Sequence, residues 1–457
     1  GRGDGRAQSE RSLEMSKRTG SLAAALILLA AAVSGCAPST APNMGQRMML
    51  EPARDAEKGG DFAKAVREYQ RAARGGVAFA QYRLARLHER GLGTAPNEEE
   101  AARWYRAASD RGFPAAKIAL AKMYEQGRGV PKDEAAALAL YLEAAEHERS
   151  RAYRLDPPRP PAVAHTRAGQ MIGQGRGGPA HPAAAAQLYR FAAEAGNPDA
   201  QFALAELYSK GQGVAADPAQ AEHWYLAAAA KYDAPASAGD ANAQNRLGQM
   251  YVDGRGVAKD VRRGVGLLEQ AAEQGHSSAQ ARLARLFEQG EGSLAADPAR
   301  AAHYYELAGA AGYTSAYYRL ATLYANGQGV PADGGRAVQF YEHAAAAGET
   351  RAYGKLGELY AEGRAVPKDE TKALEWFAEG AWHGDGRAAL RLAEAYERGQ
   401  GVAPAPLEAL AWYQIAQALG EQRAAERVGR LASELGQAQT ERATTAAETW
   451  QRERAAS

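Results

Sequence analysis

The stretch Leu120-Ala121-Lys122-Met123-Tyr124-Glu125-Gln126-Gly127-Arg128-Gly129-Val130 decides the fold, because its pattern returns along almost the whole chain. Its first glycine recurs as Gly91, Gly127, Gly175, Gly211, Gly254, Gly290, Gly327, Gly363 and Gly399. Successive copies lie 36, 48, 36, 43, 36, 37, 36 and 36 residues apart. A fixed period of this length is typical of stacked supersecondary units. Such an array predicts a surface that binds other macromolecules rather than a pocket that performs chemistry.

Each period holds two helical patterns, and the first begins at a residue that caps helices. The predicted caps are Asn97, Asp133, Asp217, Asp260, Asp297, Asp333 and Asp369, with Pro182, Pro218, Pro298 and Pro406 at the next position in their copies. Asp and Asn side chains accept hydrogen bonds from first-turn N–H groups, and proline lacks only an N–H that has no partner there. An alanine four residues after the cap and bulky residues seven and eight after it, such as Trp104-Tyr105, form one apolar stripe.

The second helix follows patterns such as Leu84-Ala85-x-Leu87 and ends at the recurring glycine, which adopts the left-handed conformation without steric cost. We count ten helix pairs over residues 53–436. Residues 437–457 then predict a capping helix and tail, with Ala446 and Trp450 on one face. The expected fold is therefore an all-α, right-handed α-solenoid.

Two copies carry insertions between their paired helices, at Glu148–Pro161 and near Lys231–Ser237. Insertions in solenoids map to loops on one edge, which often binds partners. The alternative is tolerated surface slack, because longer loops cost little.

The N-terminal region resembles an export signal. Met15-Ser16-Lys17-Arg18 is positively charged, and Leu22–Val33 is an apolar run of twelve residues, too short to cross a bilayer. Residues 1–14 are interpreted as an upstream extension, and residues 15–35 as the signal peptide.

The signal closes as Val33-Ser34-Gly35-Cys36, and Cys36 is the only cysteine of the chain. Small residues before a cysteine resemble a bacterial lipobox, which implies cleavage between Gly35 and Cys36 and lipidation of Cys36. An ordinary signal peptide with an incidental cysteine and an uncleaved anchor are the alternatives. Ala37 resembles the sorting pattern of outer-membrane lipoproteins. Residues 36–52 predict a flexible tether.

Composition excludes several classes of function. A net charge of +1 with both signs interspersed argues against a nucleic-acid groove and against a polybasic membrane patch. No cofactor, metal or small-molecule substrate is expected, and a single cysteine provides no cysteine metal site.

The candidate catalytic residues recur with the repeat, whereas catalytic groups are unique. His223 and His303 share one slot and are interpreted as surface histidines, and His88 takes the place of a tyrosine in the second helix. Glu125, Glu362 and Glu397 stand just before the glycine signal and are interpreted as solvated helix ends. We therefore expect no enzyme.

Other features favour structure over chemistry. A phosphate loop needs a strand before its glycines, whereas here a helix precedes them. The aromatic residues keep strict offsets from the caps, which indicates core rather than a sugar-stacking platform. Two breaks in the pattern, Ala168-Gly169 and Trp382-His383-Gly384-Asp385-Gly386, carry no recognisable chemistry.

The recurring motif Ala-x-x-x-Leu-Ala-x-Leu-Tyr-x-x-Gly-x-Gly-Val-x-x-Asp-x-x-x-Ala-x-x-Trp-Tyr-x-x-Ala-Ala resembles the Sel-one-like subclass of tetratricopeptide (TPR-like) repeats over about 380 residues. This resemblance implies a right-handed solenoid that acts as an adaptor in multiprotein assembly, with no catalytic residues to carry over.

Cys36, the repeats and the closing segment around Leu431 to Trp450 also resemble the outer-membrane scaffold lipoproteins of alginate export. That resemblance implies a lipid anchor on the periplasmic face of the outer membrane, and partners that include an exopolysaccharide porin and periplasmic polymer-modifying proteins.

The alginate-export lipoproteins have degenerate repeats, whereas the repeats of this chain are regular, so a Sel-one-like envelope adaptor with another partner is the alternative. A repeat enzyme acting on cell wall or β-lactams is a third, although its cysteine-rich relatives carry paired cysteines that this chain lacks. A secreted factor that binds a protein of a host or neighbouring cell is a fourth.

Overall fold

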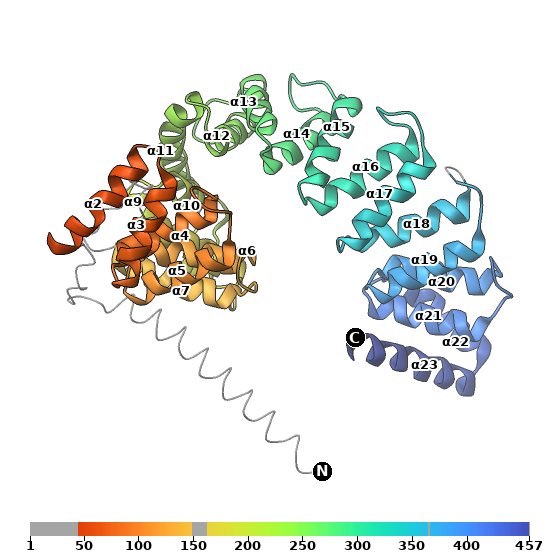
Figure 1. The fold of residues 1–457 in the computed structure, drawn as a ribbon. Coiled ribbons are helices and arrows are strands. Elements are labelled where there is room, and N and C mark those ends of the chain that lie inside the picture. The colour runs from red at the N-terminus through yellow and green to blue at the C-terminus, as the bar shows by residue number, and fades with distance from the viewer. Residues whose placement is uncertain (1–43, 149–161, 364–365, 457) are drawn as a thin grey trace, which may run out of the picture. The chain divides into compact units, whose positions relative to one another are not determined.

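The computed structural model describes residues 44–148, 162–363 and 366–456. These residues form twenty-two α-helices and no strand, apart from an isolated bridge between Glu291 and Leu294 (Figure 1). They divide into two compact units. The first holds the described residues up to Lys231 together with Arg255–Val257, and the second holds Tyr232–Gly254 and the residues from Ala258 onward.

The helices of the first unit follow one another with short turns. They are α2 (Met44–Lys58), α3 (Phe62–Arg74), α4 (Ala78–Arg90), α5 (Glu98–Asp110), α6 (Pro114–Gln126), α7 (Glu134–Glu148), α8 (Val163–Gln174), α9 (Pro182–Glu194), α10 (Pro198–Lys210) and the first part of α11 (Pro218–Ser237). From α2 to α10 each helix packs on the next one along the chain. The all-α repeat architecture that the sequence predicts is confirmed here.

The second unit continues the pattern. Its helices are α12 (Ala241–Asp253), α13 (Val261–Glu273), α14 (Ser277–Gln289), α15 (Pro298–Ala310), α16 (Thr314–Asn326), α17 (Gly334–Ala346), α18 (Arg351–Glu362), α19 (Glu370–Trp382), α20 (Gly386–Arg398), α21 (Pro406–Ala418), α22 (Ala424–Leu435) and α23 (Gln437–Ala456). Each helix from α12 to α23 again packs on the next. Among the described residues, helices α3 to α22 make the ten expected pairs, and α23 is the expected closing helix. In each pair we call the first helix the odd helix and the second the even helix, after their numbers.

The predicted helix starts are confirmed. In all seven the cap side chain accepts a hydrogen bond from the backbone N–H three residues later. The bonds run from Glu100, Ala136, Gln220, Arg263, Arg300, Arg336 and Lys372 to Asn97, Asp133, Asp217, Asp260, Asp297, Asp333 and Asp369. Each such cap stabilises its helix by about 1 kcal/mol.

The recurring glycines end the even helices in the left-handed conformation, as predicted, with one exception. Gly91, Gly127, Gly175, Gly211, Gly254, Gly327, Gly363 and Gly399 have φ between 64° and 74° and ψ between 24° and 44°. Gly290 instead has ψ of 160°. Its turn contains the one extra residue of the 37-residue copy, and that turn closes through the Glu291–Leu294 bridge.

The second glycine of the signal brings the turn against the start of the same pair's odd helix. A Cβ on Gly93 would overlap the backbone of Phe62, the first residue of α3, and a Cβ on Gly129 would overlap Glu98, the first residue of α5. At Gly401 the distance to the Glu370 carbonyl oxygen would be 2.9 Å. In these pairs the second glycine therefore lets the two helices close tightly at one end.

The core is the predicted stripe. The residue four after each cap, an alanine in every copy except for Gly264 in α13, is buried, as is the residue eight after the cap. The bulky residue seven after the cap is half-buried in most copies. In α5 these residues are Ala101, Tyr105 and Trp104. The small alanines let neighbouring helices approach, and the rings fill the space beside them.

Two sequence predictions of loops need correction. Residues 44–52, assigned to the tether, form the first part of α2, where Leu50 is fully buried against the core of the first pairs. The insertion at Lys231–Ser237 forms the last turns of α11, because the alanine-rich run before it continues as helix. Tyr232 and Ala236 are buried, so this insertion is not surface slack. Residues 149–161 of the other insertion lie outside the described residues.

Candidate interaction surface

A buried tyrosine in most odd helices is bonded to a carboxylate on the even helix just before it. The Tyr105 hydroxyl donates to Glu89 at 2.7 Å, and the Tyr141 hydroxyl donates to Glu125 at 3.1 Å. The same bond recurs from Tyr69 to Glu57, Tyr225 to Glu206, Tyr305 to Glu288 and Tyr413 to Glu397. In α17 the Tyr341 hydroxyl lies 2.9 Å from the Thr322 hydroxyl.

The environment of these tyrosines keeps them protonated. Burial, together with the adjacent negative charge of Glu89, raises the pKa of Tyr105 far above its usual value. Burial alone dominates at Tyr341 and raises its pKa to about 12. These phenols therefore act as hydrogen-bond donors that join successive pairs, and none is tuned toward proton transfer near neutral pH.

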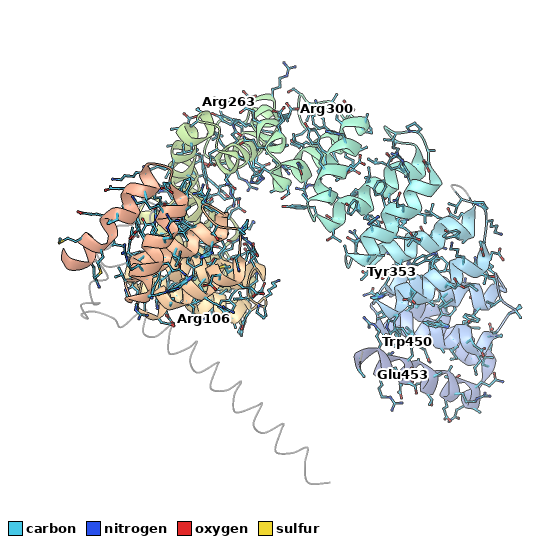
Figure 2. All side chains as sticks on the ribbon, in the orientation of Figure 1. Arg106, Arg263, Arg300, Tyr353, Trp450 and Glu453 are labelled. Carbon is cyan, nitrogen blue, oxygen red and sulfur yellow. The ribbon has the colours of Figure 1, made fainter. Side chains whose placement is uncertain are left out.

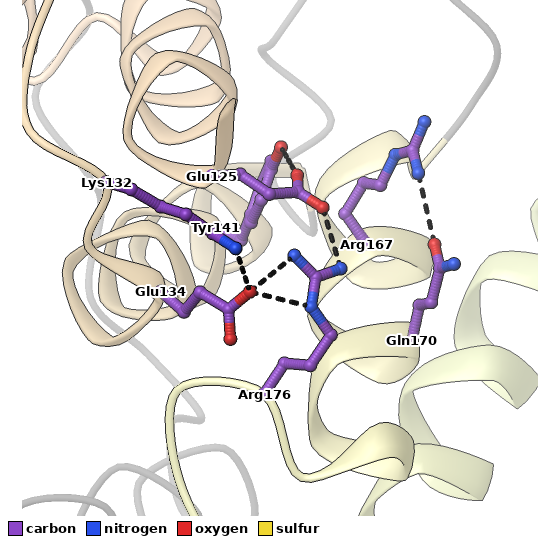
Figure 3. A network of polar contacts seen from close by, with 7 residues as sticks. All are labelled: Glu125, Lys132, Glu134, Tyr141, Arg167, Gln170 and Arg176. Atoms are coloured by element: carbon purple, nitrogen blue, oxygen red, sulfur yellow. Dashed lines mark hydrogen bonds and ion pairs between the residues drawn. The ribbon is translucent and has the colours of Figure 1, made fainter. Parts of the chain in front are cut away.

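An arginine between the two glycines completes this network in three copies, and Figure 3 shows the copy that contains Arg176. Arg176 donates from Nη1 to Glu125 at 2.9 Å and from Nη2 to Glu134 at 3.0 Å. Glu134 begins the odd helix of the same pair, whereas Glu125 lies on the preceding pair. The hydrogen bonds from Arg176 hold the pKa of Glu134 below its usual value. The arginine thus links two neighbouring pairs.

The interpretation of Glu125 and Glu397 as solvated helix ends is wrong. Their side chains are only 17% and 18% exposed, because each accepts a tyrosine hydroxyl and an arginine. Glu362 is exposed, as predicted. Both buried carboxylates stand two residues before the glycine, whereas Glu362 stands one residue before it, and a shift of one residue turns a side chain about 100° around a helix.

A second set of charges runs along the even helices. The residue eight positions before the helix-ending glycine is basic in seven of the nine copies; the nine residues are Arg83, Ala119, Arg167, Ala203, Arg246, Arg282, Arg319, Lys355 and Arg391. We call these seven basic residues the basic column. Sequence reasoning missed it, although aligning the copies on the glycine would have revealed it.

Three residues of the basic column pair with carboxylates of the preceding pair, whereas Lys355 pairs with Glu358 of its own helix. In the second unit Arg282 reaches Asp253 at 2.6 Å, Arg319 reaches Glu288 at 3.6 Å and Arg391 reaches Glu358 at 3.6 Å. The Arg319 and Arg391 side chains are 48% and 47% exposed. Ion pairs this exposed contribute about 0–1 kcal/mol each, so a partner's charges can replace them at little cost.

The surface beside Arg391 of the basic column has a hollow, where α18, α20 and the turn before α22 meet. A cavity of about 480 Å³ there is lined by the side chains of Arg387, Arg391, Arg423, Glu358, Glu394 and Glu421 around Leu390. Arg423 forms an ion pair with Glu421 at 2.8 Å, and Arg391 forms one with Glu394 at 3.3 Å. Exposed Arg387 adds a further positive charge. This hollow has the size and the charges to receive a polar side chain of a partner protein.

The odd helices carry a less complete set of basic residues. Three positions after the cap, five of the ten odd helices have a basic residue: Lys64, Arg263, Arg300, Arg336 and Lys372. The last four each lie over an aromatic ring, as Arg300 does over Phe287 at 3.8 Å (Figure 2 labels Arg300). The basic column of the even helices recurs in seven of nine copies, so we take the even helices as the candidate interaction surface.

The predicted histidine roles hold. His223 and His303 are exposed, and each ring lies against the aromatic residue that follows it. His88 is half-buried, and that burial lowers its pKa. Among the described residues no cluster of three or more His, Cys, Asp or Glu is arranged to hold a metal ion.

Both breaks in the sequence pattern have structural reasons. A Cβ at Gly169 would lie 3.1 Å from the Tyr189 ring, so a larger residue would crowd that contact. Asp385 caps α20 through bonds to the Arg387 and Ala388 N–H groups. Trp382 packs edge-on against Trp450 of α23.

The predicted lipidation residue Cys36 and the cleavage residue Gly35 lie outside the described residues, as does the rest of the predicted signal peptide. Across the part of the chain that the structure describes, no helix has the length and hydropathy needed to span a bilayer.

The family model of the Sel1 repeat matches nine segments that cover well over half of the chain. They are residues 78–113, 114–148, 162–197, 198–233, 241–276, 277–313, 314–349, 350–385 and 386–421. The chain belongs to the Sel1 repeat family. Each matched unit is an even helix followed by the next odd helix, joined by the tyrosine–carboxylate bond in most copies, which is why ten pairs contain nine units.

The chain is similar to solved structures of repeat proteins. A protective antigen of uropathogenic Escherichia coli that displays the same repeat fold is 27% identical, with 89% of this chain and 84% of that chain covered and a TM-score of 0.51. A Sel1 repeat protein from Oxalobacter formigenes is 27% identical over 57% of this chain and 96% of its own, with a TM-score of 0.45. No curated protein sequence matched the chain. Sel1 repeats generally mediate protein–protein interactions, and the fold is typically a non-enzymatic scaffold.

Proposed function

We propose that this protein is a lipid-anchored scaffold on the periplasmic face of the outer membrane that organises envelope proteins for exopolysaccharide assembly and secretion. The observation that carries the scaffold part is the set of nine Sel1 repeats with a basic column on the even helices, of which Arg319 and Arg391 are about half exposed. The lipobox-like Val33-Ser34-Gly35-Cys36 and the resemblance to alginate-export lipoproteins support the place and the process.

The basic column suits a protein partner better than a polymer or a small molecule. Its positive charges alternate with carboxylates, so the surface offers both signs at fixed spacing rather than one continuous potential. Complementary charges on a partner set register and specificity more than affinity. A repeat array presents such contacts over several pairs at once, which is how solenoids hold extended partners.

Site-specific cross-linking in living cells tests the scaffold role. A photoreactive amino acid replaces Arg319 or Arg391 on the even helices, and Glu306 or Glu342 on the odd helices serves as the matched exposed control. We expect even-helix positions to capture discrete envelope proteins, identified by mass spectrometry, and control positions to capture few. Capture of no protein from even-helix positions would reject this surface, and capture of cytosolic proteins alone would reject the location.

Fractionation tests the anchor. The wild-type protein is expected in the outer-membrane fraction, and the Cys36→Ala variant in the soluble periplasmic fraction or as uncleaved precursor. An unchanged distribution of Cys36→Ala would exclude lipidation as the anchor. Hydrolysis assays with peptidoglycan and β-lactams address the alternative of a repeat enzyme, for which we expect no turnover.

A further inference from the structure

The N-terminal helix carries the two most exposed large hydrophobic side chains of the described residues. Met48 is 66% exposed and Met49 is 59% exposed, whereas Leu50 and Ala53 of the same helix are fully buried. Exposed Pro52 lies three and four residues further on and borders both methionines, and exposed Glu51 borders Met48 at the edge of this set. The end of α2 nearer to Cys36 thus presents two neighbouring apolar side chains that the described residues leave exposed.

The chain length ties this surface to the predicted anchor. Seven residues separate Cys36 from Met44, where α2 begins, and eight Cα steps span at most about 28 Å in any conformation. Among the residues of α2 whose exposure is described, the exposed charged ones are Glu51, Asp55 and Lys58, which follow the methionines along the helix. The start of α2 therefore stays within about 28 Å of an anchored Cys36.

We propose that Met48 and Met49 dock α2 onto the lipid surface, so that the first helix rests on the bilayer interface. This inference rests on the proposed lipid anchor. Two methionines are far too small for a protein interface, which needs about 20 to 30 residues on each side. A membrane contact needs no such area, because the acyl chains supply the affinity and the tether supplies a high effective concentration.

Unbranched methionine side chains suit this contact because they adapt to a fluid environment. The rest of α2 holds them in place. Arg54 lies 4.6 Å from the centre of the Phe79 ring, and Glu57 accepts bonds from Tyr69 and Arg83, so α2 is fixed on α3 and α4. Docking the methionines would consequently orient the first unit relative to the bilayer rather than move α2 alone.

Spin labelling of the full-length mature protein tests the inference. Cys36 is the only cysteine, and lipidation would convert its thiol to a thioether, so Met49→Cys would introduce the single free thiol. A nitroxide at position 49 is compared with one at Leu226→Cys, another exposed apolar position of the first unit. The labelled protein is placed in phosphatidylethanolamine–phosphatidylglycerol vesicles, and collision rates with oxygen and with a water-soluble nickel chelate are measured. Met48→Cys serves as the second labelling site if Met49→Cys folds poorly.

We expect the ratio of oxygen to nickel collisions to be several-fold higher at position 49 than at position 226, and to fall to the value at 226 without vesicles. Water-like values at both sites, with one label per chain, would overturn the docking while leaving the anchor intact. Protection of position 49 from both reagents would also overturn it, because a protein or a second copy would then cover α2. Labelling of Cys36 itself in the mature wild-type protein would instead show that the anchor is wrong.

Discussion

The hydroxyl of Tyr105 donates a 2.7 Å hydrogen bond to the carboxylate of Glu89, which lies sixteen residues earlier on the preceding even helix. The same relationship returns in five further copies, so it is a property of the repeat. The carboxylate also receives an arginine, which in three copies comes from the next Gly-Arg-Gly turn, as Arg128 does for Glu89. One polar group thus joins three segments of a stack that apolar packing alone would leave free to slide.

Removing one such hydroxyl should loosen the stack locally. In Tyr105→Phe the half-buried Glu89 carboxylate keeps only the distant Arg128 guanidinium at 3.5 Å. We expect a loss of about 1 kcal/mol, seen as an approximately fivefold faster hydrogen exchange in α4 and α5. Tyr313→Phe is the control, because the hydroxyl of that exposed tyrosine makes no hydrogen bond to the described residues. Equal exchange in both variants would show that the bond contributes nothing.

Substitution of glycine by alanine should change the stability of the protein in opposite directions at two kinds of position. Gly93 has φ of 72°, and a Cβ there would overlap the Phe62 backbone, so Gly93→Ala should destabilise the protein by about 2 kcal/mol. Gly266 lies inside α13 with nothing within 4 Å of an added Cβ, so Gly266→Ala should stabilise by about 1 kcal/mol. Urea unfolding followed by circular dichroism measures both. If both alanines destabilised equally, close approach of the turn would not be the reason for the second glycine.

Local features of the fold were predictable from the sequence because they depend on local chemistry. The capping carboxylates, the left-handed glycines and the apolar stripe are each determined by a few neighbouring residues. Lys231–Ser237 was not predictable as helix, because the insertion contains Pro235, and the buried contacts of Tyr232 and Ala236 outweigh that signal. The helical form of residues 44–52 likewise depends on Leu50 meeting the core of the first pairs.

The candidate interaction surface was less predictable, because charge alone does not tell a solvated helix end from a buried acceptor. Glu125 and Glu362 look alike in the sequence, yet a shift of one residue directs only Glu125 toward the Tyr141 hydroxyl. The basic column needed the copies to be aligned on their glycines. Pairs such as Arg319 with Glu288 needed the stacking of the helices as well, since 31 residues separate the two partners.

Stability should depend on pH through His276. Its Nδ1 accepts the Ala279 N–H at 3.3 Å as the cap of α14, which requires neutral imidazole. Burial is the main cause that lowers its pKa, aided by the positive charge of Arg246 and opposed by a backbone hydrogen bond and by Asp240. In the unfolded chain a histidine has a pKa of about 6.5. The contribution of His276 is therefore complete above that pH, and it is lost as the pH falls through the lowered pKa of the folded state.

His276→Asn separates this effect from the other titrating groups. Asparagine cannot titrate, and Asn197 makes the same cap in α10 at 3.0 Å. We expect wild type to lose more stability than His276→Asn between pH 8 and pH 5, measured as the shift of the urea midpoint. The exposed His303→Asn should behave like wild type. A wild-type shift no larger than that of His276→Asn would exclude His276 as the titrating cap.

The last helix is held by a cluster of three tryptophans. Trp450 of α23, labelled in Figure 2, meets Trp382 and Trp412 edge-on with ring centres 5.8 and 5.7 Å apart, and Arg454 donates to the Trp382 carbonyl at 2.6 Å. Complete burial of a tryptophan contributes about 3–5 kcal/mol. Because Trp450 is half-buried, we expect Trp450→Ala to cost about 2 kcal/mol and to release α23. Trp450→Phe keeps a ring in the cluster and should cost less.

Hydrogen exchange over Gln437–Ala456 measures this release directly, and the fluorescence of Trp382 and Trp412 should shift to longer wavelength as water reaches them. Capping helices protect the outer face of the last repeat, so α21 should also exchange faster in Trp450→Ala. Unchanged protection of α23 would mean that Ala443 and Ala447, which are buried against α21 and its neighbours, hold the helix without the tryptophan cluster.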